Sequence, residues 1–345
     1  MSDFLDTDLL TGDADLLNLL TEEIEDEAES KLELVIQAEG AIDPRLKLLS
    51  HSSRTLLHKC PRKFQLYRLN SKDSGEEDIA QGVTFAYGHA VGIGVQSTLE
   101  GKSEAQVYID MLLSWDVDLL DRNDRQKKSF WEACFAMQKF AHMKDTGYLD
   151  DYELVYYNGK PAVELSFKIL LPDGFTYRGY VDAVLRHKTT GAVVVLECKT
   201  SSGQPNSAMY KNSGQALGYS IVLDILFPEL SSYTVLYLIY HTKSREYTEL
   251  HFDKSLLQRA LWLQELLIDS KHVELYEEFG SYPMHGESCF DFFKPCEYLG
   301  LCTLSTENLI KPLTLPKLKQ IQAEEYMFTV DFYELVEAQI KKGEV

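Results

Sequence analysis

Residues 179–200 read GYVDAVLRHKTTGAVVVLECKT, two runs rich in valine and leucine on either side of the polar segment KTTG. Such runs around a short glycine-containing turn are typical of a β-hairpin. If the turn is centred between Thr189 and Thr190, residues whose numbers sum to 379 face each other, and Asp182 opposes Glu197. Opposed side chains lie about 5 Å apart, and two like charges so placed need a cation between them. Carboxylate oxygens suit Mg²⁺ or Mn²⁺, so the hairpin predicts a site for either ion.

The second strand of this hairpin also brings a lysine to the two acids. Side chains two positions apart share a face, so Lys199 stands beside Glu197, with Val193 and Val195 further along the same face. Cys198 points the other way into a second apolar face, which predicts a central strand covered on both sides. A lysine beside metal-bound carboxylates can orient a water or stabilise charge on a phosphate. A surface ion pair between Lys199 and either acid is the structural alternative.

The rest of the chain alternates between helical and strand patterns. We expect strands at 154–158, 161–172, 175–187, 192–200 and 233–241, and helices at 84–100, 103–147 (broken near Asn123), 206–227 and 253–279, after a first helical stretch from Ser52 interrupted by Pro61. This order predicts an α/β or α+β core with helical additions.

Two motifs carry a resemblance to a known family. Asp182 followed by Glu197-Cys198-Lys199 resembles the D…ExK signature of the PD-(D/E)XK nucleases, and Gln215-Ala-Leu-Gly-Tyr219 resembles the QxxxY motif of their RecB-like branch. The resemblance spans about residues 50–305. It implies a restriction-endonuclease-like core, in which a central mixed sheet is flanked by helices, and it places Gln215 and Tyr219 near the catalytic metal and the substrate phosphates. Packing in the core is the alternative role for Tyr219.

One family position differs in this chain. Members of the family usually carry a metal-binding histidine in a pattern like FGxxxH, and the matching stretch 87–92 has Gly92 where the histidine should be. His89 and Gln96 lie one turn before and one turn after Gly92, on the same helix face, so either could reach the metal. Imidazole is the better ligand, which makes His89 the first candidate. Glu164 sits where the family often has an acidic strand residue, and solvent exposure is its alternative.

Four cysteines form a second candidate site. Cys289, Cys296 and Cys302 are spaced C-x6-C-x5-C, and Cys60 could supply the fourth thiolate of a [4Fe–4S] cluster or a structural zinc ion. Helicase-associated and CRISPR-associated RecB-like exonucleases with an iron–sulfur cluster likewise have one cysteine before the nuclease core and three after it. Residues 60–64, CPRKF, resemble the stretch around their first cysteine. Their usual C-terminal spacing is C-x2-C-x5-C, so the first gap is longer here. The resemblance favours [4Fe–4S], acting as a staple between distant segments.

Composition and charge set the broad class. The chain has 345 residues, 45% hydrophobic and 26% charged, which excludes collagen, wholesale disorder and a disulfide-built miniprotein. We see no run of about 18 apolar residues and no signal peptide, so we expect a cytoplasmic protein, bacterial or phage-encoded, with Cys134 and Cys198 as inert buried thiols.

The net charge is −20, and residues 1–45 hold 14 acidic and 2 basic side chains. We expect 1–45 to be a disordered acidic leader, with a docking segment as the alternative, 46–305 to be the nuclease domain and 306–345 a C-terminal extension.

Together these patterns predict a Mg²⁺- or Mn²⁺-dependent DNA exonuclease of recombination, repair or replication. Arg62, Lys63 and Arg68 alternate with aromatic residues and are candidate DNA contacts, although a solvated face is the alternative. The chain has no Walker-type GxxxxGK[ST] sequence, which suggests a stand-alone enzyme or a subunit that borrows its motor from a helicase. A single-strand-binding protein or an annealing protein is a further candidate partner. A catalytically inactive subunit that binds DNA or protein is the alternative function.

Overall fold

The computed structural model describes residues 42–69, 82–120, 128–203, 206–230, 232–291, 294–303 and 315–343. Most of the segment expected to be an acidic leader therefore lies outside the described residues, as does Asn123, where a helix break was expected. Residues from Ile42 onward form one compact unit.

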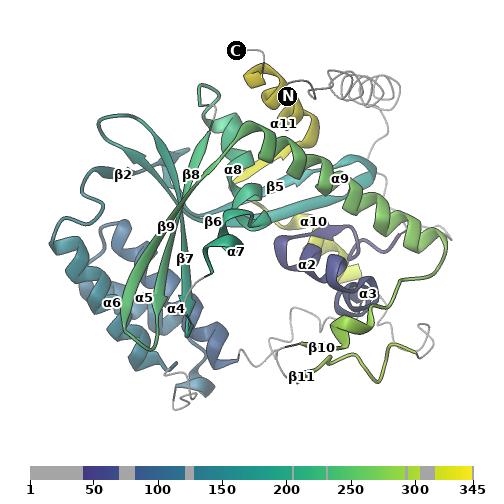
Figure 1. Cartoon of the computed structure of the whole chain (residues 1–345), viewed down its shortest axis with the longest axis horizontal. Helices are drawn as coiled ribbons and strands as arrows, with labels where there is room; N and C mark the ends of the chain where they lie inside the picture. Colours follow the sequence, from purple (N-terminus) through teal and green to yellow (C-terminus); the bar gives the residue numbers. More distant parts are fainter. Residues whose placement is uncertain are drawn as a thin grey trace, which may run out of the picture. The chain divides into compact units, whose positions relative to one another are not determined.

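A mixed sheet of eight strands organises the described residues. Six strands follow one another in the order β12-β5-β6-β7-β8-β9, and β1 and β2 also pair with β6 (Figure 1). Their bounds are β1 Leu48–Leu49, β2 Tyr152–Leu154, β5 Val163–Leu170, β6 Thr176–His187, β7 Val193–Ser201, β8 Tyr233–His241, β9 Glu246–Lys254 and β12 Phe328–Asp331. The pairs β7–β8, β5–β12 and β1–β6 are parallel, and the others are antiparallel. This confirms the expected α/β architecture with a central mixed sheet.

Helices cover both faces of the sheet. Val193 and Val195 of β7 belong to an apolar cluster shared with α2, α8, α9 and α11, whereas Val194 and Leu196 belong to a second cluster shared with α4, α5 and α6. The helices are α2 His51–Lys59, α3 Pro61–Leu69, α4 Val83–Leu99, α5 Glu104–Leu113, α6 Phe130–Asp145, α7 Ser207–Lys211, α8 Gly214–Leu226, α9 Leu256–Glu278, α10 Leu315–Ala323 and α11 Phe332–Gly343. The alternation confirms that β7 is a central strand with both faces covered (Figure 1).

Shorter elements complete the chain. They are two small hairpins, β3 Tyr156–Tyr157 with β4 Lys160–Pro161 and β10 Phe290–Asp291 with β11 Lys294–Pro295, and the 3₁₀ turns η1 Val117–Leu119, η2 Pro172–Gly174 and η3 Gly286–Cys289. Among the described residues, no helix has both the length and the apolar character needed to cross a bilayer.

The central hairpin has the register that its sequence predicts. Ala183 pairs with Leu196 and Arg186 with Val193, so paired residue numbers sum to 379 along β6 and β7. The paired segment ends at Ala183 and Leu196, and Asp182 and Glu197 are the next residues on the two strands. The strands thus separate where the two carboxylates begin.

Two expectations about the elements need correction. Residues 246–254 form the strand β9, and the long helix begins only at Leu256, where Ser255 and Gln258 form a capping box. The helix expected at 206–227 is divided at Ser213 into α7 and α8. Within the region expected as a C-terminal extension, β12 joins the sheet beside β5, and α11 packs against α8 and α9 with Leu335 buried.

Candidate active site

Asp182 and Glu197 lie side by side at the point where β6 and β7 separate. The carboxylate oxygen Oδ2 of Asp182 accepts a hydrogen bond from the backbone N–H of Cys198 at 2.8 Å, which ties it to the strand that carries Glu197. Glu197 is 1% exposed, and Asp182 is half-buried. The sheet therefore holds two acidic side chains together with little access to water.

The pKa values of both acids respond to this burial. Burial raises the pKa of Asp182 well above its ordinary value, and the negative charge of Glu197 raises it further. Burial also raises the pKa of Glu197, against the opposing effect of Lys199. Without a bound cation, keeping each carboxylate ionised therefore costs free energy. A cation bound between the two acids would lower that cost.

Lys199 links the acids to helix α8. Its ammonium donates a hydrogen bond to Glu197 Oε1 at 2.5 Å and another to Gln215 Oε1 at 3.0 Å, and the Gln215 amide donates to the Tyr219 hydroxyl at 2.7 Å. Burial alone would lower the pKa of Lys199, but the charge and the hydrogen bond of Glu197 outweigh it, and the pKa is raised. Lys199 is therefore a cation at neutral pH, bonded directly to Gln215 and through it to Tyr219.

Glu164 is a third acid at this site. On either side of it, Val163 pairs with Ala183 and Leu165 pairs with Val181. Glu164 therefore lies opposite Asp182 across β5 and β6. Its negative charge contributes to the raised pKa values of Asp182 and Glu197. The backbone of Glu164 has φ 45°, an uncommon conformation for a residue other than glycine, which costs about 1–3 kcal/mol. The sequence allowed two interpretations of Glu164, an acidic residue of the site or a solvent-exposed side chain. This placement favours the first.

The two candidate ligands on α4 have different surroundings. The amide of Gln96, 4% exposed, donates a hydrogen bond to Glu164 Oε1 at 2.8 Å. His89 is exposed, and its ring stacks on Phe85 with the centroids 6.1 Å apart. A Cβ atom at Gly92 would have open space around it. Gln96 is thus the candidate that reaches the acidic cluster, and a metal-binding role for His89 stays a prediction.

The glycines of the two motifs permit close packing beneath the acids. A Cβ atom at Gly179 would lie 2.7 Å from the Phe167 ring, and one at Gly218 would lie 2.7 Å from the Trp262 ring. Both distances are well inside normal contact, so neither position accepts a side chain without a shift of its neighbour. The glycines of GYVD and QALGY therefore let aromatic side chains seat β6 and α8 against the core.

A cavity of about 350 Å³ is lined by residues of α2, α8 and α9. His51 lines it, and burial together with the charge of Lys199 lowers the pKa of His51 to about 4, so its ring is neutral. Trp262 also lines the cavity, and its indole N–H is buried with no hydrogen-bond partner among the described residues. Sequence reasoning could not identify His51, because only the tertiary fold brings α2 close enough for the charge of Lys199 to act on it.

The donor set fits a divalent cation held by few protein ligands. Glu197 Oε2 is buried and has no hydrogen-bond partner among the described residues, which leaves it available to a cation. Within the same residues, no three His, Cys, Asp or Glu side chains are grouped to hold one ion. Mg²⁺ commonly uses one or two protein carboxylates and keeps several waters, so Asp182 and Glu197 are sufficient for it.

The four candidate cluster cysteines share one neighbourhood. Burial raises the pKa of the Cys302 thiol, and the charges of Cys296, Cys60 and Cys289 raise it further. The segment at Cys60 and the segment at Cys289 are joined directly, since the Ser288 hydroxyl donates a hydrogen bond to the Lys59 carbonyl at 2.7 Å. All six cysteines of the chain are free thiols. The thiols fit a soft metal or cluster by their chemistry, although the described residues hold them outside ligand geometry.

The basic residues of α3 are engaged within the fold. Arg62 is 7% exposed and donates to Gln65 Oε1 at 2.5 Å, and Arg68 donates to the Arg45 carbonyl at 2.7 Å. Burial, followed by the charge of Arg178, lowers the pKa of Arg68 to about 10. Lys63 lies 3.7 Å from Glu297. Contact of Arg62, Lys63 and Arg68 with DNA stays a prediction.

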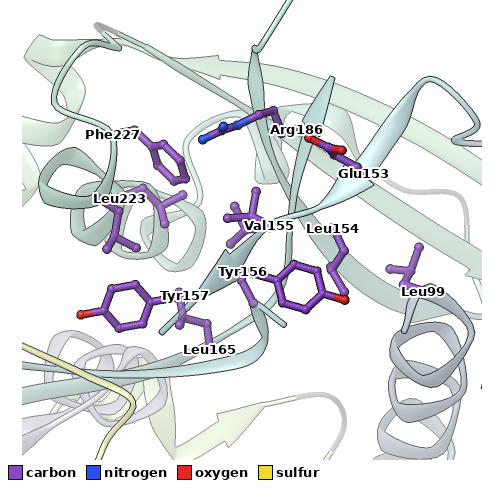
Figure 2. A pocket seen from close by; sticks show the side chains of 13 residues that line it. Leu99, Glu153, Leu154, Val155, Tyr156, Tyr157, Leu165, Arg186, Leu223 and Phe227 are labelled. Carbon is purple, nitrogen blue, oxygen red and sulfur yellow. The ribbon is translucent and has the colours of Figure 1, made fainter. Parts of the chain in front are cut away.

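Another cavity, of about 660 Å³, lies between β2, β6 and the end of α8 (Figure 2). Arg186 extends over the Phe227 ring, and Glu153 lies on the strand paired with that of Arg186. Asp182, Glu197 and Lys199 do not line this cavity. It is therefore separate from the candidate active site.

Comparisons with known proteins bear on this site. Residues 48–303 match the family model of the PD-(D/E)XK nuclease superfamily. No curated protein matches the chain. Similar solved structures include one described as a "Putative exonuclease" from Eubacterium rectale, at 13% identity and a TM-score of 0.42 over 86% of this chain and all of that one. A structure of SSO0001 has 14% identity and a TM-score of 0.26 over 70% and 95% of the two chains. At such low scores, the two structures add nothing to the family match.

Proposed function

Because the chain belongs to the PD-(D/E)XK nuclease superfamily, we propose that it is a Mg²⁺- or Mn²⁺-dependent DNA exonuclease that acts in recombination, repair or replication. One observation carries the proposal: buried Glu197 and half-buried Asp182 lie beside a protonated lysine, and one oxygen of Glu197 has no hydrogen-bond partner among the described residues. An arrangement made only for stability would have little reason to bury two like charges together.

Asp182 and Glu197 would hold the metal ion, and Gln96 would keep Glu164 in place beside them. A bound Mg²⁺ or Mn²⁺ supplies a water of lowered pKa and positive charge next to the phosphate. Lys199 would orient the attacking water or donate hydrogen bonds to the charge that develops on the phosphate oxygens.

Gln215 and Tyr219 position this lysine. Gln215 accepts from Lys199 and donates to Tyr219, so the amide fixes the ammonium in the direction of Glu197. The cavity lined by His51 and Trp262 would provide space for the nucleotide next to the scissile phosphate, since the charge of Lys199 acts on His51. Its neutral His51 ring offers a polar contact without competing for the metal.

We also propose that Cys60, Cys289, Cys296 and Cys302 bind a [4Fe–4S] cluster, with zinc as the alternative. Their shared neighbourhood and the hydrogen bond between Ser288 and Lys59 support this proposal. The cluster would link the start of the nuclease domain to the segment after α9 and so stabilise both. Iron analysis and the visible spectrum of the anaerobically purified protein test it, and Cys296→Ser should lose both iron and colour, whereas Cys134→Ser should retain them. A colourless protein that contains zinc would favour the zinc alternative.

The nuclease proposal is tested with two DNA substrates of the same sequence, one linear and end-labelled, the other a covalently closed circle. The wild-type protein with Mg²⁺ or Mn²⁺ should degrade the linear DNA and leave the circle intact. Glu197→Gln and Lys199→Met should each reduce the rate by at least about 10²-fold, because the first removes a charged metal ligand and the second removes the positive charge beside the reacting phosphate. Asp145→Asn, at an exposed acid on α6, is the control and should keep full activity.

Each alternative has its own outcome in this assay. Cleavage of the circle at the same rate would identify an endonuclease. A folded wild-type protein that binds DNA but cleaves neither substrate with either metal would refute the enzyme and favour an inactive DNA-binding subunit. We propose a helicase, a single-strand-binding protein or an annealing protein as the partner in the cell.

A further inference from the structure

The cavity between α2, α8 and α9 adjoins the candidate active site through the first turn of α8. Gly214, the first residue of that helix, lines the cavity. The next residue, Gln215, accepts a hydrogen bond from Lys199 at 3.0 Å. Consecutive Cα atoms are about 3.8 Å apart, so one residue of this turn lies at the cavity and its neighbour at the lysine. A DNA strand with one phosphate at Lys199 would therefore bring an adjacent nucleotide to the cavity.

Arg54 of α2 brings unused hydrogen-bond donors to this cavity, which it lines. The residue is 6% exposed, its Nε donates a hydrogen bond to buried Asp269, and its guanidinium lies 4.9 Å from the centroid of the Trp262 ring. The outer nitrogens Nη1 and Nη2 have no hydrogen-bond partner among the described residues. Nη2 lies 4.0 Å from Glu265 Oε2, beyond hydrogen-bond distance. A buried guanidinium that is fixed from one side and has free donors on the other fits a bound anion.

Two further features of the cavity favour an anion. The N-cap residue of α8, Ser213, makes no side-chain hydrogen bond to the first turn, so the N–H groups there lack this partner at the positive end of the helix dipole. The exposed ring of His58 also lines the cavity. Burial lowers the pKa of His51, and the positive charges of Lys199, Arg54 and His58 lower it further. Several positive charges thus act on this cavity, although the whole chain has a net charge of −20.

We propose that Arg54, His58 and the N-terminus of α8 bind a backbone phosphate of the DNA strand, next to the phosphate that is cleaved. The inference rests on the proposed nuclease function and names the contact that holds the strand at the site. Arg54 donates from its outer nitrogens, in the fork geometry that matches a phosphate. Asp269 holds both cationic side chains in place, since it also hydrogen-bonds the His58 ring at 2.6 Å. Such a contact positions the strand without reading its sequence.

Fluorescence anisotropy with a labelled DNA duplex that has single-stranded tails, in Ca²⁺, tests the contact through binding alone. Gly214→Asp should weaken binding about tenfold or more, because it places a carboxylate at the cavity. The fold should be kept, since a Cβ atom at Gly214 would lie at an ordinary 3.6 Å from Trp262 Nε1 and an acid suits the first turn of a helix. Ser103→Asp, which adds the same charge at the N-cap of α5, is the matched control and should bind as the wild type does. Glu265→Gln removes a negative charge from the cavity and should tighten binding.

The role of Arg54 itself is tested in a double variant, Arg54→Gln with Asp269→Asn, which leaves neither buried charge unpaired. It should bind DNA about tenfold or more weakly. The slope of log affinity against log salt should also fall by about 0.7–0.9, the value for one phosphate contact, which a purely structural role would leave unchanged. Arg245→Gln with Glu132→Gln, which removes another arginine–glutamate pair, is the matched control and should keep both affinity and slope. Circular dichroism checks that each variant is folded.

The outcomes separate this inference from the nuclease proposal. If Gly214→Asp binds DNA as tightly as the wild type, or if the Arg54 double variant keeps the wild-type salt slope, the phosphate contact is refuted even where the wild type cleaves DNA. A wild type that does not bind DNA would overturn the contact as well. Binding that depends on Arg54 and Gly214 in a protein that never cleaves would support the contact and refute the enzyme.

Discussion

Replacing Asp182 with asparagine should stabilise the metal-free protein and remove its response to metal. Asp182 and Glu197 are the next residues beyond a β-pairing, where opposed Cβ atoms lie about 5 Å apart. Two charges at that distance repel by about 3 kcal/mol at an effective dielectric constant of 20. Lys199 offsets part of this repulsion, so we expect a net gain of about 1–2 kcal/mol in the free energy of unfolding. The asparagine carbonyl can still accept the hydrogen bond from Cys198.

The pH dependence has a definite sign. The folded pKa of Asp182 is raised, so over the interval above its ordinary value near 3.8 the folded protein binds more protons than the unfolded chain. The wild type without metal therefore loses stability as the pH rises through this interval. The advantage of Asp182→Asn should be absent below about pH 4 and should grow as the pH rises.

Urea denaturation in EDTA and in Mg²⁺, from pH 4 to pH 8, measures the stability gain of Asp182→Asn and the response of each protein to metal. Mg²⁺ at ten times its dissociation constant should stabilise the wild type by about 1.4 kcal/mol and should leave Asp182→Asn unchanged. Asp145→Asn should behave as the wild type under all conditions. If Asp182→Asn were no more stable than the wild type at pH 8 in EDTA, or if Mg²⁺ stabilised both equally, the account of the paired acids would be refuted.

Two further predictions concern packing and buried charge. Gly218→Ala should lower the free energy of unfolding by about 1–3 kcal/mol, because its methyl group would meet the Trp262 ring at 2.7 Å. Gly92→Ala, with open space around it in α4, should raise the free energy of unfolding by about 0.5–1 kcal/mol. Equal effects of the two variants in urea titrations would contradict this. Arg259→Met should cost about 3–5 kcal/mol, since it removes a fully buried partner of an aspartate, and the exposed Lys341→Met should cost almost nothing. A urea midpoint for Arg259→Met close to that of the wild type would show that the buried pair contributes no net stability.

The central hairpin was predictable because its register follows from local rules. Alternation along β7 and a turn at Thr189–Thr190 suffice to oppose Asp182 and Glu197. The strand β8 has the predicted bounds for a similar reason, since nearly all its residues are buried and read as one apolar run.

Other parts depend on contacts that the sequence does not encode locally. Edge strand β9 exposes alternate polar residues, so EYTELHFDK has too little apolar content to stand out beside the long helix that follows. Glu164 joins the acids only through the pairing of β5 with β6, and its positive φ has no sequence signature. Arg62 and Arg68 read as an exposed basic face, yet α3 is buried on most sides, and its arginines bond within the fold.

The buried ion network at Asp224 bears on how the protein is made. Asp224 on α8 is fully buried, and its partners are Arg259 at 2.8 Å and Lys342 at 2.6 Å, with Gln339 donating to the same carboxylate. Lys342 follows Asp224 by 118 residues, on α11, so a chain still in translation cannot complete the environment of α8 until that last helix has emerged from the ribosome. Since α8 also carries Gln215 and Tyr219, we expect the positioning of Lys199 to be completed only after α11 has been made. Synthesis itself would thus delay the moment at which the protein becomes competent to act on nucleic acid.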